Sequence, residues 1–267
     1  MFSKCSGALN SLTVVMKKYS TVSTTMTDWT QRRLFGLTVF LLLLLALWDF
    51  SGLDLPFARL FGSADGFALR SSHWFVIAFH EIPRDVSSLL VVALIVGIFK
   101  PWSFLKRLSR SERVQLVLSV LGGMLLITVL KKANHTSCPW DLNEFGGRAL
   151  YVSHWAWGVL DQGPGHCFPA GHASSAFGFL SGWFVVRKLG SKVAARWLAT
   201  ALVMGLVLGL TQQLRGAHYM SHTLWTAWIC WTFGLLVDVA CTAFRARRQA
   251  QVDSVQNNIQ SAHEVQA

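Results

Sequence analysis

The sequence predicts an all-α membrane protein built as a polytopic bundle of six transmembrane helices. Of its 267 residues 52% are hydrophobic and only 14% are charged, whereas a soluble domain carries about 25% charged residues. Several apolar runs approach or exceed the roughly 20 residues that a spanning helix needs. Segments rich in Lys and Arg alternate with segments poor in them, as expected where a chain crosses a membrane repeatedly.

Six apolar segments are the expected spans. They cover residues 34–50, 86–99, 114–130, 173–186, 197–214 and 223–241. The second could begin as early as Trp74 and cross the polar group from His80 to Asp85, for which we expect a structural ion network. Three regions follow: an N-terminal segment 1–33, a transmembrane domain 34–244 and a polar tail 245–267, which lacks aromatic residues and is expected to be disordered.

Positive charge in the short loops predicts the orientation. Lys and Arg gather before the first span, between the second and third, between the fourth and fifth, and after the sixth. We therefore expect both termini in the cytoplasm. The first thirty residues are largely polar, so the first span resembles a retained helix more than a cleaved signal peptide. The net charge of +11 is dispersed among loops, which argues against a nucleic-acid partner.

Three polar clusters lie where apolar segments meet loops on the expected outer side. They are Lys131 with Cys138 and Pro139, residues 168–172, and residues 215–222. Lys131 and Arg215 are suited to phosphate oxygens, and Gly171 allows the backbone to approach an anion before a helix start. His172 and His218 are candidates for proton transfer and nucleophilic attack because imidazole titrates near neutral pH. The clusters indicate a site for a phosphate ester at a bilayer surface.

The clusters resemble the type-2 phosphatidic acid phosphatase superfamily, whose motifs are K-x6-R-P, P-S-G-H and S-R-x5-H-x3-D. Lys131 and Pro139 fit the first motif at the right spacing. Pro169-Ala170-Gly171-His172 fits the second with Ala for Ser, and His218 with His222 fits the third with His for Asp. The resemblance extends over residues 114–239.

The resemblance implies a lipid phosphatase that needs no metal or other cofactor. His218 would attack phosphorus to give a phosphohistidine, and His172 would protonate the leaving oxygen. The implied phosphate-binding residues are Lys131, Arg215, Ala170 and Gly171. The implied place is a bacterial inner membrane, with the site facing the periplasm. The substrate would be a membrane lipid phosphate: phosphatidic acid, phosphatidylglycerophosphate, a polyprenyl diphosphate or a lipid A phosphate.

Five positions depart from the family motifs, the first being Thr211, which stands where the third motif has Ser. Cys138 and Gln212 stand where the family has Arg, Ala170 where it has Ser, and His222 where it has Asp. We expect Arg215 or Arg148 to take over the role of the missing arginines. We expect His222 to orient His218, with Asp141 or Glu144 supplying the missing carboxylate.

Other interpretations stay open. A phosphotransferase would use the same residues, and a lipid-binding or partner-docking protein without activity would explain the substitutions. His218 and His222 lie one helical turn apart, which also suits zinc. A transporter is less favoured, because the polar residues gather at one face.

Cys138 and Cys167 both lie on the expected oxidising side and flank the first two clusters, so a disulfide could join them. Cys5, Cys230 and Cys241 are expected to be free.

Overall fold

A computed structural model describes residues 31–156 and 158–266. Most of the expected N-terminal segment 1–33, with Cys5, lies outside the described residues. The chain divides into two compact units, Met1–Leu43 and Leu44–Ala267. The first helix, Gln31–Phe50, runs across this division. The all-α polytopic membrane fold predicted from the sequence is confirmed.

The larger unit is almost entirely helical. Its α-helices are α2 (Asp54–Ala58), α3 (His73–Val76), α4 (Ile82–Phe99), α5 (Arg110–Ala133), α6 (Ser174–Phe177), α7 (Trp183–Val186), α8 (Ser191–Leu214) and α9 (Met220–Gln266). A π-helical turn, η1 (Ile77–Glu81), joins α3 to α4, and 3-10 segments are η2 (Ser103–Arg107), η3 (Pro139–Asp141), η4 (Asn143–Phe145), η5 (Gly178–Gly182) and η6 (Arg187–Leu189). The short strands β1 (Gly62–Ser63) and β2 (Gly66–Phe67) pair antiparallel.

Five of the six expected spans are helices long and apolar enough to cross a membrane, counted over the described residues. They are Gln31–Phe50, His73–Arg107, Arg110–Ala133, Ser191–Leu214 and Met220–Ser261. The fourth, expected at 173–186, is a succession of short segments, α6, η5 and α7. Small residues let this succession pack closely: a Cβ on Gly178 would lie 2.5 Å from Met124 Cγ, and one on Gly182 2.7 Å from Leu116 Cδ1.

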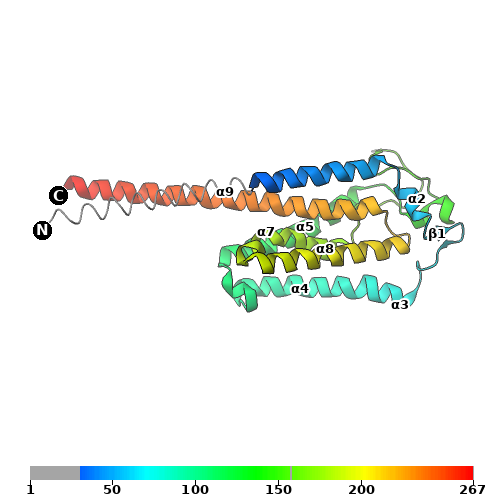
Figure 1. Ribbon diagram of the computed structural model, residues 1–267, viewed down its shortest axis with the longest axis horizontal. Helices are drawn as coiled ribbons and strands as arrows, with labels where there is room; N and C mark the ends of the chain where they lie inside the picture. The colour runs from blue at the N-terminus through cyan, green and yellow to red at the C-terminus, as the bar shows by residue number, and fades with distance from the viewer. Residues whose placement is uncertain (1–30, 157, 267) are drawn as a thin grey trace. The chain divides into compact units, whose positions relative to one another are not determined.

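The polar tail is helical where disorder was expected, so that expectation is wrong. Helix α9 continues without a break to Gln266, well beyond the ends of α5 and α8 (Figure 1). A helix that extends an existing one avoids the cost of nucleation. Side-chain pairs one turn apart support it: Gln249 Nε2 donates to Asp253 Oδ1 at 2.8 Å, and Gln260 Nε2 to Glu264 Oε1 at 3.3 Å.

Helix α5 has a defined start and places Lys131 at its end. Ser109 and Glu112 form a capping box, in which the Ser109 hydroxyl accepts from the Glu112 N–H and the Glu112 carboxylate accepts from the Ser109 N–H. The last turn carries Lys131 and Lys132. Their positive charges interact favourably with the negative end of the helix dipole.

Asp54 in α2 caps the beginning of α9. Its Oδ1 accepts from the Ser221 backbone N–H at 3.0 Å and from Trp48 Nε1 at 2.9 Å, and its Oδ2 accepts from the Ser221 hydroxyl. A carboxylate at this place satisfies backbone donors and the positive end of the helix dipole. The bond ties the first turn of α9, which carries His222, to the segment between the first two spans.

We predict that Gly205→Ala destabilises the bundle. Its Cβ would lie 2.2 Å from the ring of Phe177, which is fully buried, so the substitution should cost about 1–3 kcal/mol of unfolding free energy. Thermal unfolding in detergent measures the loss. Gly36→Ala, at a position with open space, is the matched control, and equal melting temperatures for both variants would contradict the packing described here.

We predict that Asp54→Ala destabilises the protein by about 1–3 kcal/mol, because it leaves buried donors of Ser221 and Trp48 without an acceptor. The exposed Asp65 is the control, since Asp65→Ala removes the same carboxylate without touching α9. Denaturant unfolding followed by Trp fluorescence compares the two. An Asp54→Ala variant as stable as Asp65→Ala would show that the cap contributes nothing.

Candidate active site

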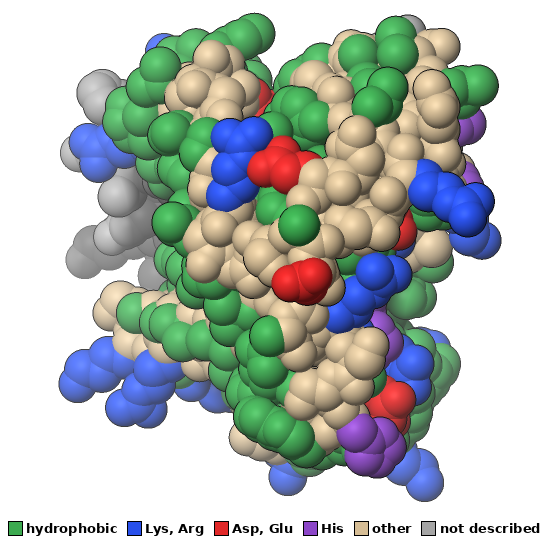
Figure 2. Space-filling model, turned by 90° about the vertical axis from the view of Figure 1, so that its right-hand side faces the viewer, with side chains coloured by type: hydrophobic (Ala, Val, Ile, Leu, Met, Phe, Trp, Pro, Cys, Tyr) green, Lys and Arg blue, Asp and Glu red, His purple; other side chains and the backbone are tan. Residues whose placement is uncertain are grey.

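The three sequence clusters meet at the end of the bundle that carries α2 and β1. Figure 2 looks onto this end, where Lys, Arg, Asp, Glu and His side chains interrupt the hydrophobic surface. The ring centroids of His172 and His218 are 6.2 Å apart. A Cβ on Gly171 would lie 3.9 Å from Lys131 Nζ, so the lysine ammonium lies directly beside the second cluster. The structure thus brings together Lys131, Gly171, His172 and His218.

The second cluster is anchored to α9 by its backbone. The Ala170 N–H donates to the His222 carbonyl at 3.2 Å, and Thr226 Oγ1 donates to the Ala170 carbonyl at 3.1 Å. The Ala170 amide is therefore engaged within the protein, which contradicts its expected role in binding phosphate. The expectation for Gly171 stays a prediction.

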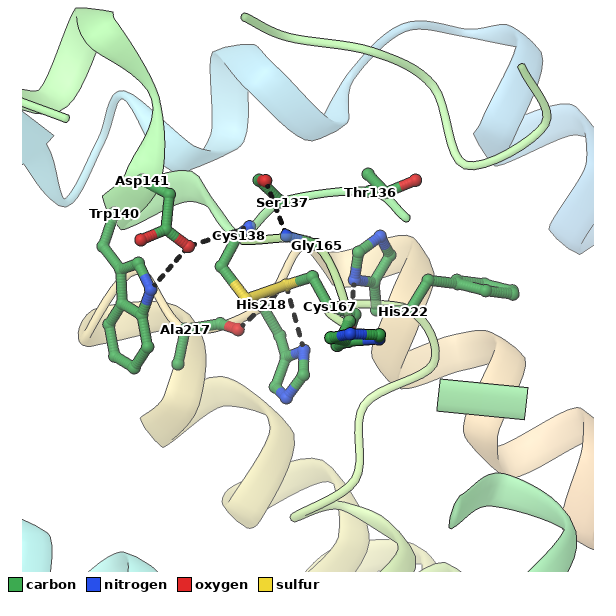
Figure 3. Close-up of a disulfide and its surroundings, with 12 residues drawn as sticks. Thr136, Ser137, Cys138, Trp140, Asp141, Gly165, Cys167, Ala217, His218 and His222 are labelled. Carbon is green, nitrogen blue, oxygen red and sulfur yellow. Dashed lines mark hydrogen bonds between the residues drawn. A yellow bond between two sulfur atoms is a disulfide. The ribbon is translucent and has the colours of Figure 1, made fainter. Parts of the chain in front are cut away.

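His218 lies in the turn between α8 and α9 and is 2% exposed. The preceding Gly216 has a φ of +72°, and a Cβ there would come within 2.4 Å of the Phe67 ring, so the turn requires glycine. The side chain of Cys167 reaches this histidine: Cys167 Sγ lies 3.6 Å from His218 Nδ1 (Figure 3).

Cys138 and Cys167 form a disulfide, with Cα atoms 5.1 Å apart. It links the first and second clusters directly beside His218, as Figure 3 shows. Backbone bonds hold the same segments together: the Cys167 N–H donates to Thr136 O at 2.9 Å, and the His166 N–H to Asn134 O at 3.0 Å.

His222 does not hydrogen bond to His218, contrary to expectation. Its Nδ1 lies 3.1 Å from the Cys167 carbonyl oxygen, and the two imidazole centroids are 6.0 Å apart. His222 Nε2 is buried and has no hydrogen-bond partner among the described residues. Cys167 therefore contacts both histidines: its sulfur lies beside His218, and its backbone carbonyl faces His222. Burial lowers the pKa of His218, and a hydrogen bond to the Cys167 backbone acts in the opposite direction.

Arg215 is held by Gln212, the residue that replaces a family arginine. Arg215 Nη1 donates to Gln212 Oε1 at 2.9 Å, and Arg215 Nε and Nη2 donate to the Arg70 carbonyl at 3.3 and 3.0 Å. A guanidinium has five N–H groups, so two stay available to a phosphate. Burial lowers the pKa of Arg215.

Asp141 and Glu144, the carboxylates expected to support the histidines, bind other residues. Asp141 closes the η3 turn, where its Oδ2 accepts from the Cys138 N–H at 3.3 Å and from Trp140 Nε1 at 2.9 Å. Burial raises its pKa. Glu144 pairs with Arg59. Neither bonds to a histidine within the described residues, so that expectation is wrong. Arg148 is exposed, and its backbone N–H donates to Asp141 O at 2.8 Å.

A different carboxylate, Asp49, lies on the histidine side of the site. Its Oδ2 accepts from Trp225 Nε1 at 2.7 Å and Trp155 Nε1 at 2.9 Å. It lies 3.4 Å from His154 Nε2, and the His154 and His222 rings meet edge to face at 5.4 Å. Sequence analysis missed Asp49 and His154, because Asp49 ends an apolar span and neither belongs to a motif.

His80 also lies beside the site, although the sequence predicted a structural role for it. His80 lies in the π-helical turn η1, and the centroid of its ring is 3.9 Å from that of His172. π-bulges occur frequently at functional sites. Of the expected ion network, the exposed neighbours Arg84 and Asp85 form an ion pair at 3.1 Å. The ring contact with His172 places His80 in the candidate site.

A groove with a volume of about 580 Å³ lies along the bundle. Its walls come from α4, α6, α8 and the segment 102–105, and are mostly apolar. Pro83 and Ser175 line it, each one helical turn after His80 and His172. Arg196 and Trp102 lie among its other lining residues. The groove therefore comes within one helical turn of His80 and His172 along the chain, although neither histidine lines it.

Burial decides the charge of the two principal histidines. It lowers the pKa of His218 well below its usual value, and the nearby positive charge of Lys131 acts in the same direction. It lowers the pKa of His172 to about 3, assisted by His80 and Lys131. Both imidazoles are therefore neutral at pH 7 in the substrate-free site.

Among the described residues, the side chains grouped closely enough to hold a metal ion are Cys138, Cys167 and His218, whose ligand atoms lie within 4.8 Å of one another. The thiolate is the form of cysteine that binds a metal, and the two sulfurs are joined in the disulfide. In the oxidised protein this group does not fit a metal ion.

The family described as the PAP2 superfamily matches residues 112–245, half of the chain. None of the curated proteins matches the sequence. Among solved structures, the transmembrane PAP2-type phosphatidylglycerolphosphate phosphatase from Bacillus subtilis is 17% identical, with a TM-score of 0.44, covering 80% of this chain and 96% of that chain. With its three motifs gathered at one end of a membrane bundle, this chain belongs to the PAP2 superfamily.

Proposed function

We propose that this protein is an integral membrane lipid phosphatase that hydrolyses a phosphate monoester or diphosphate through a phosphohistidine on His218. The observation that carries the proposal is the meeting of His218, His172 and Lys131 at one end of the bundle, with an apolar groove whose lining includes Ser175, one helical turn after His172. Membership of the PAP2 superfamily supports a phosphatase. The groove supports a substrate with a hydrocarbon chain.

The spacing of the two imidazoles suits in-line phosphoryl transfer. With 6.2 Å between the ring centroids, a phosphoryl group between them would have a nitrogen of His218 on one side and the leaving oxygen near His172 on the other. The neutral imidazole of His218 carries the lone pair that attacks phosphorus. Lys131 and the free N–H groups of Arg215 would neutralise the charge on the phosphoryl oxygens.

Hydrolysis then requires the reverse proton transfer. After His172 has given its proton to the leaving oxygen, it is a neutral base that can take a proton from water as the water attacks the phosphohistidine. Phosphate leaves and His218 is restored. A lipid hydroxyl in the place of water would make the protein a phosphotransferase.

The groove favours a substrate with its phosphate at headgroup depth and its chain along α4 and α8. Phosphatidic acid, phosphatidylglycerophosphate, a polyprenyl diphosphate and a lipid A phosphate all have this form. We place the site on the periplasmic face of a bacterial inner membrane. The distribution of Lys and Arg supports this placement, and so does a disulfide beside the site, because disulfides persist in oxidising compartments.

We predict that purified protein in detergent releases phosphate from a lipid phosphate in the presence of EDTA, and that His218→Ala reduces kcat at least about 10³-fold, as expected for loss of a nucleophile. Rapid acid-free quenching with a ³²P-labelled substrate should trap a phosphohistidine in the wild type only. The exposed His73 is the control, since His73→Ala should behave as wild type.

Three outcomes would contradict this proposal in different ways. Transfer of label to a second lipid would identify a phosphotransferase. Activity abolished by EDTA would indicate a metal site. No turnover of any lipid phosphate by folded protein would favour a binding or docking role.

We predict that the second pKa of the substrate phosphate sets the alkaline limb of the pH dependence of kcat/KM. His172 is neutral above a pKa of about 3 in the free site, so its proton must arrive with the monoanionic phosphate, whose second pKa is about 6. Raising the pH removes that proton and lowers kcat/KM. His218, with its depressed pKa, should add no acidic limb near pH 6.5.

The measurement compares two substrates whose phosphate groups differ in their second pKa. The midpoint of the alkaline limb should move with the substrate. A midpoint that stays the same for both would assign the limb to a protein group and overturn this assignment of the proton.

A further inference from the structure

We propose that the Cys138–Cys167 disulfide is the positioning group of the nucleophile: the Cys167 sulfur accepts the Nδ1–H of His218 and thereby leaves the lone pair on Nε2. The inference rests on the proposed function for its catalytic meaning. Cys167 Sγ lies 3.6 Å from His218 Nδ1 (Figure 3).

The chemistry of the sulfur determines the tautomer. A disulfide sulfur carries no hydrogen, so it can only accept, and a neutral imidazole carries one N–H and one lone pair. The contact is therefore favourable only when Nδ1 bears the hydrogen. Nε2, the ring nitrogen farther from the disulfide, then holds the lone pair needed for attack on phosphorus.

No carboxylate competes for this position in the described part of the chain. The family aspartate is His222, whose Nδ1 faces the Cys167 carbonyl at 3.1 Å. Asp141 is engaged by Cys138 and Trp140, and Asp49 by Trp155, Trp225 and His154. Cys138, at the place of a family arginine, supplies the second sulfur that removes the S–H from Cys167.

The disulfide is not the sole link between its two segments. Two backbone bonds, Cys167 N–H to Thr136 O and His166 N–H to Asn134 O, already pair them. The Gly165 N–H also donates to Ser137 Oγ at 3.1 Å, and that hydroxyl is held by the buried Asp161 at 2.9 Å. The effect on His218 can therefore be separated from an effect on folding.

Two single substitutions distinguish positioning from tethering, because both break the same disulfide. Cys167→Ala removes the sulfur beside His218. Cys138→Ala leaves a Cys167 thiol, which can accept from His218 Nδ1 or donate, either to that nitrogen or to Ala217 O at 3.2 Å. We expect kcat to fall about 10- to 10⁴-fold in Cys167→Ala, the larger figure being typical of a wrong tautomer, and clearly less in Cys138→Ala.

The direct readout is the tautomer of His218 in substrate-free protein labelled with ¹⁵N-histidine. We expect Nδ1–H in the wild type and a mixture of tautomers in both variants, with His218→Ala identifying the signal. Cys241→Ser, which changes a free cysteine, should leave both tautomer and kcat unchanged.

Reduction of the wild type gives a second measurement without a substitution. Dithiothreitol supplies two electrons and two protons, the S–S bond becomes two thiols, and the reductant closes to its cyclic disulfide. We expect kcat to fall and to recover on reoxidation. An unchanged His218 tautomer in Cys167→Ala, or equal losses of kcat in the two alanine variants, would overturn the proposal. Absence of any phosphohistidine in the oxidised wild type, with the tautomer as expected, would overturn the proposed function instead.

Discussion

The site depends on Cys167, which holds together parts of three separate segments. Its sulfur is bonded to Cys138 in the first cluster and lies against His218 in the third, and its carbonyl meets His222 at the start of α9. Loops at a helix end have few internal constraints, so catalytic side chains placed on them need cross-links to keep their geometry. Here one residue supplies a covalent link, a contact to a side chain and a backbone acceptor.

The departures from the family motifs form a coherent set around this residue. Gln212, in place of an arginine, accepts a hydrogen bond from Arg215 and donates one to the Phe79 carbonyl. The guanidinium at this place is therefore supplied by Arg215, three residues further along the chain. His222, in place of an aspartate, bonds to the Cys167 carbonyl. Removing a carboxylate and adding a neutral sulfur keeps the buried His218 uncharged, which suits a nucleophile better than a cation would.

Neutral imidazoles in a buried, positively charged surrounding have a consequence for binding. Lys131 and Arg215 would be costly to bring together without a counter-ion, since like charges repel strongly where water is excluded. An anionic phosphate relieves that repulsion and raises the pKa of His172 toward the range in which it can hold a proton. Substrate binding and the protonation of the general acid are thus expected to be coupled.

Local sequence determined the apolar spans and the chemical identity of the site. Hydrophobic length is a property of consecutive residues, and the motif residues Lys131, His172 and His218 have the same chemistry in any fold. The tertiary structure alone decided which distant side chains meet them. His80 contacts His172, Asp49 contacts His154 and Glu144 pairs with Arg59, and each of these contacts joins residues that lie tens to more than a hundred positions apart. Asp141 instead bonds to its near neighbours Cys138 and Trp140. The short helical segments between Ser174 and Leu189 likewise depend on close packing against α5 and α9. A Cβ on Gly178 would contact Met124 of α5, and a Cβ on Gly234 of α9 would contact Ser181.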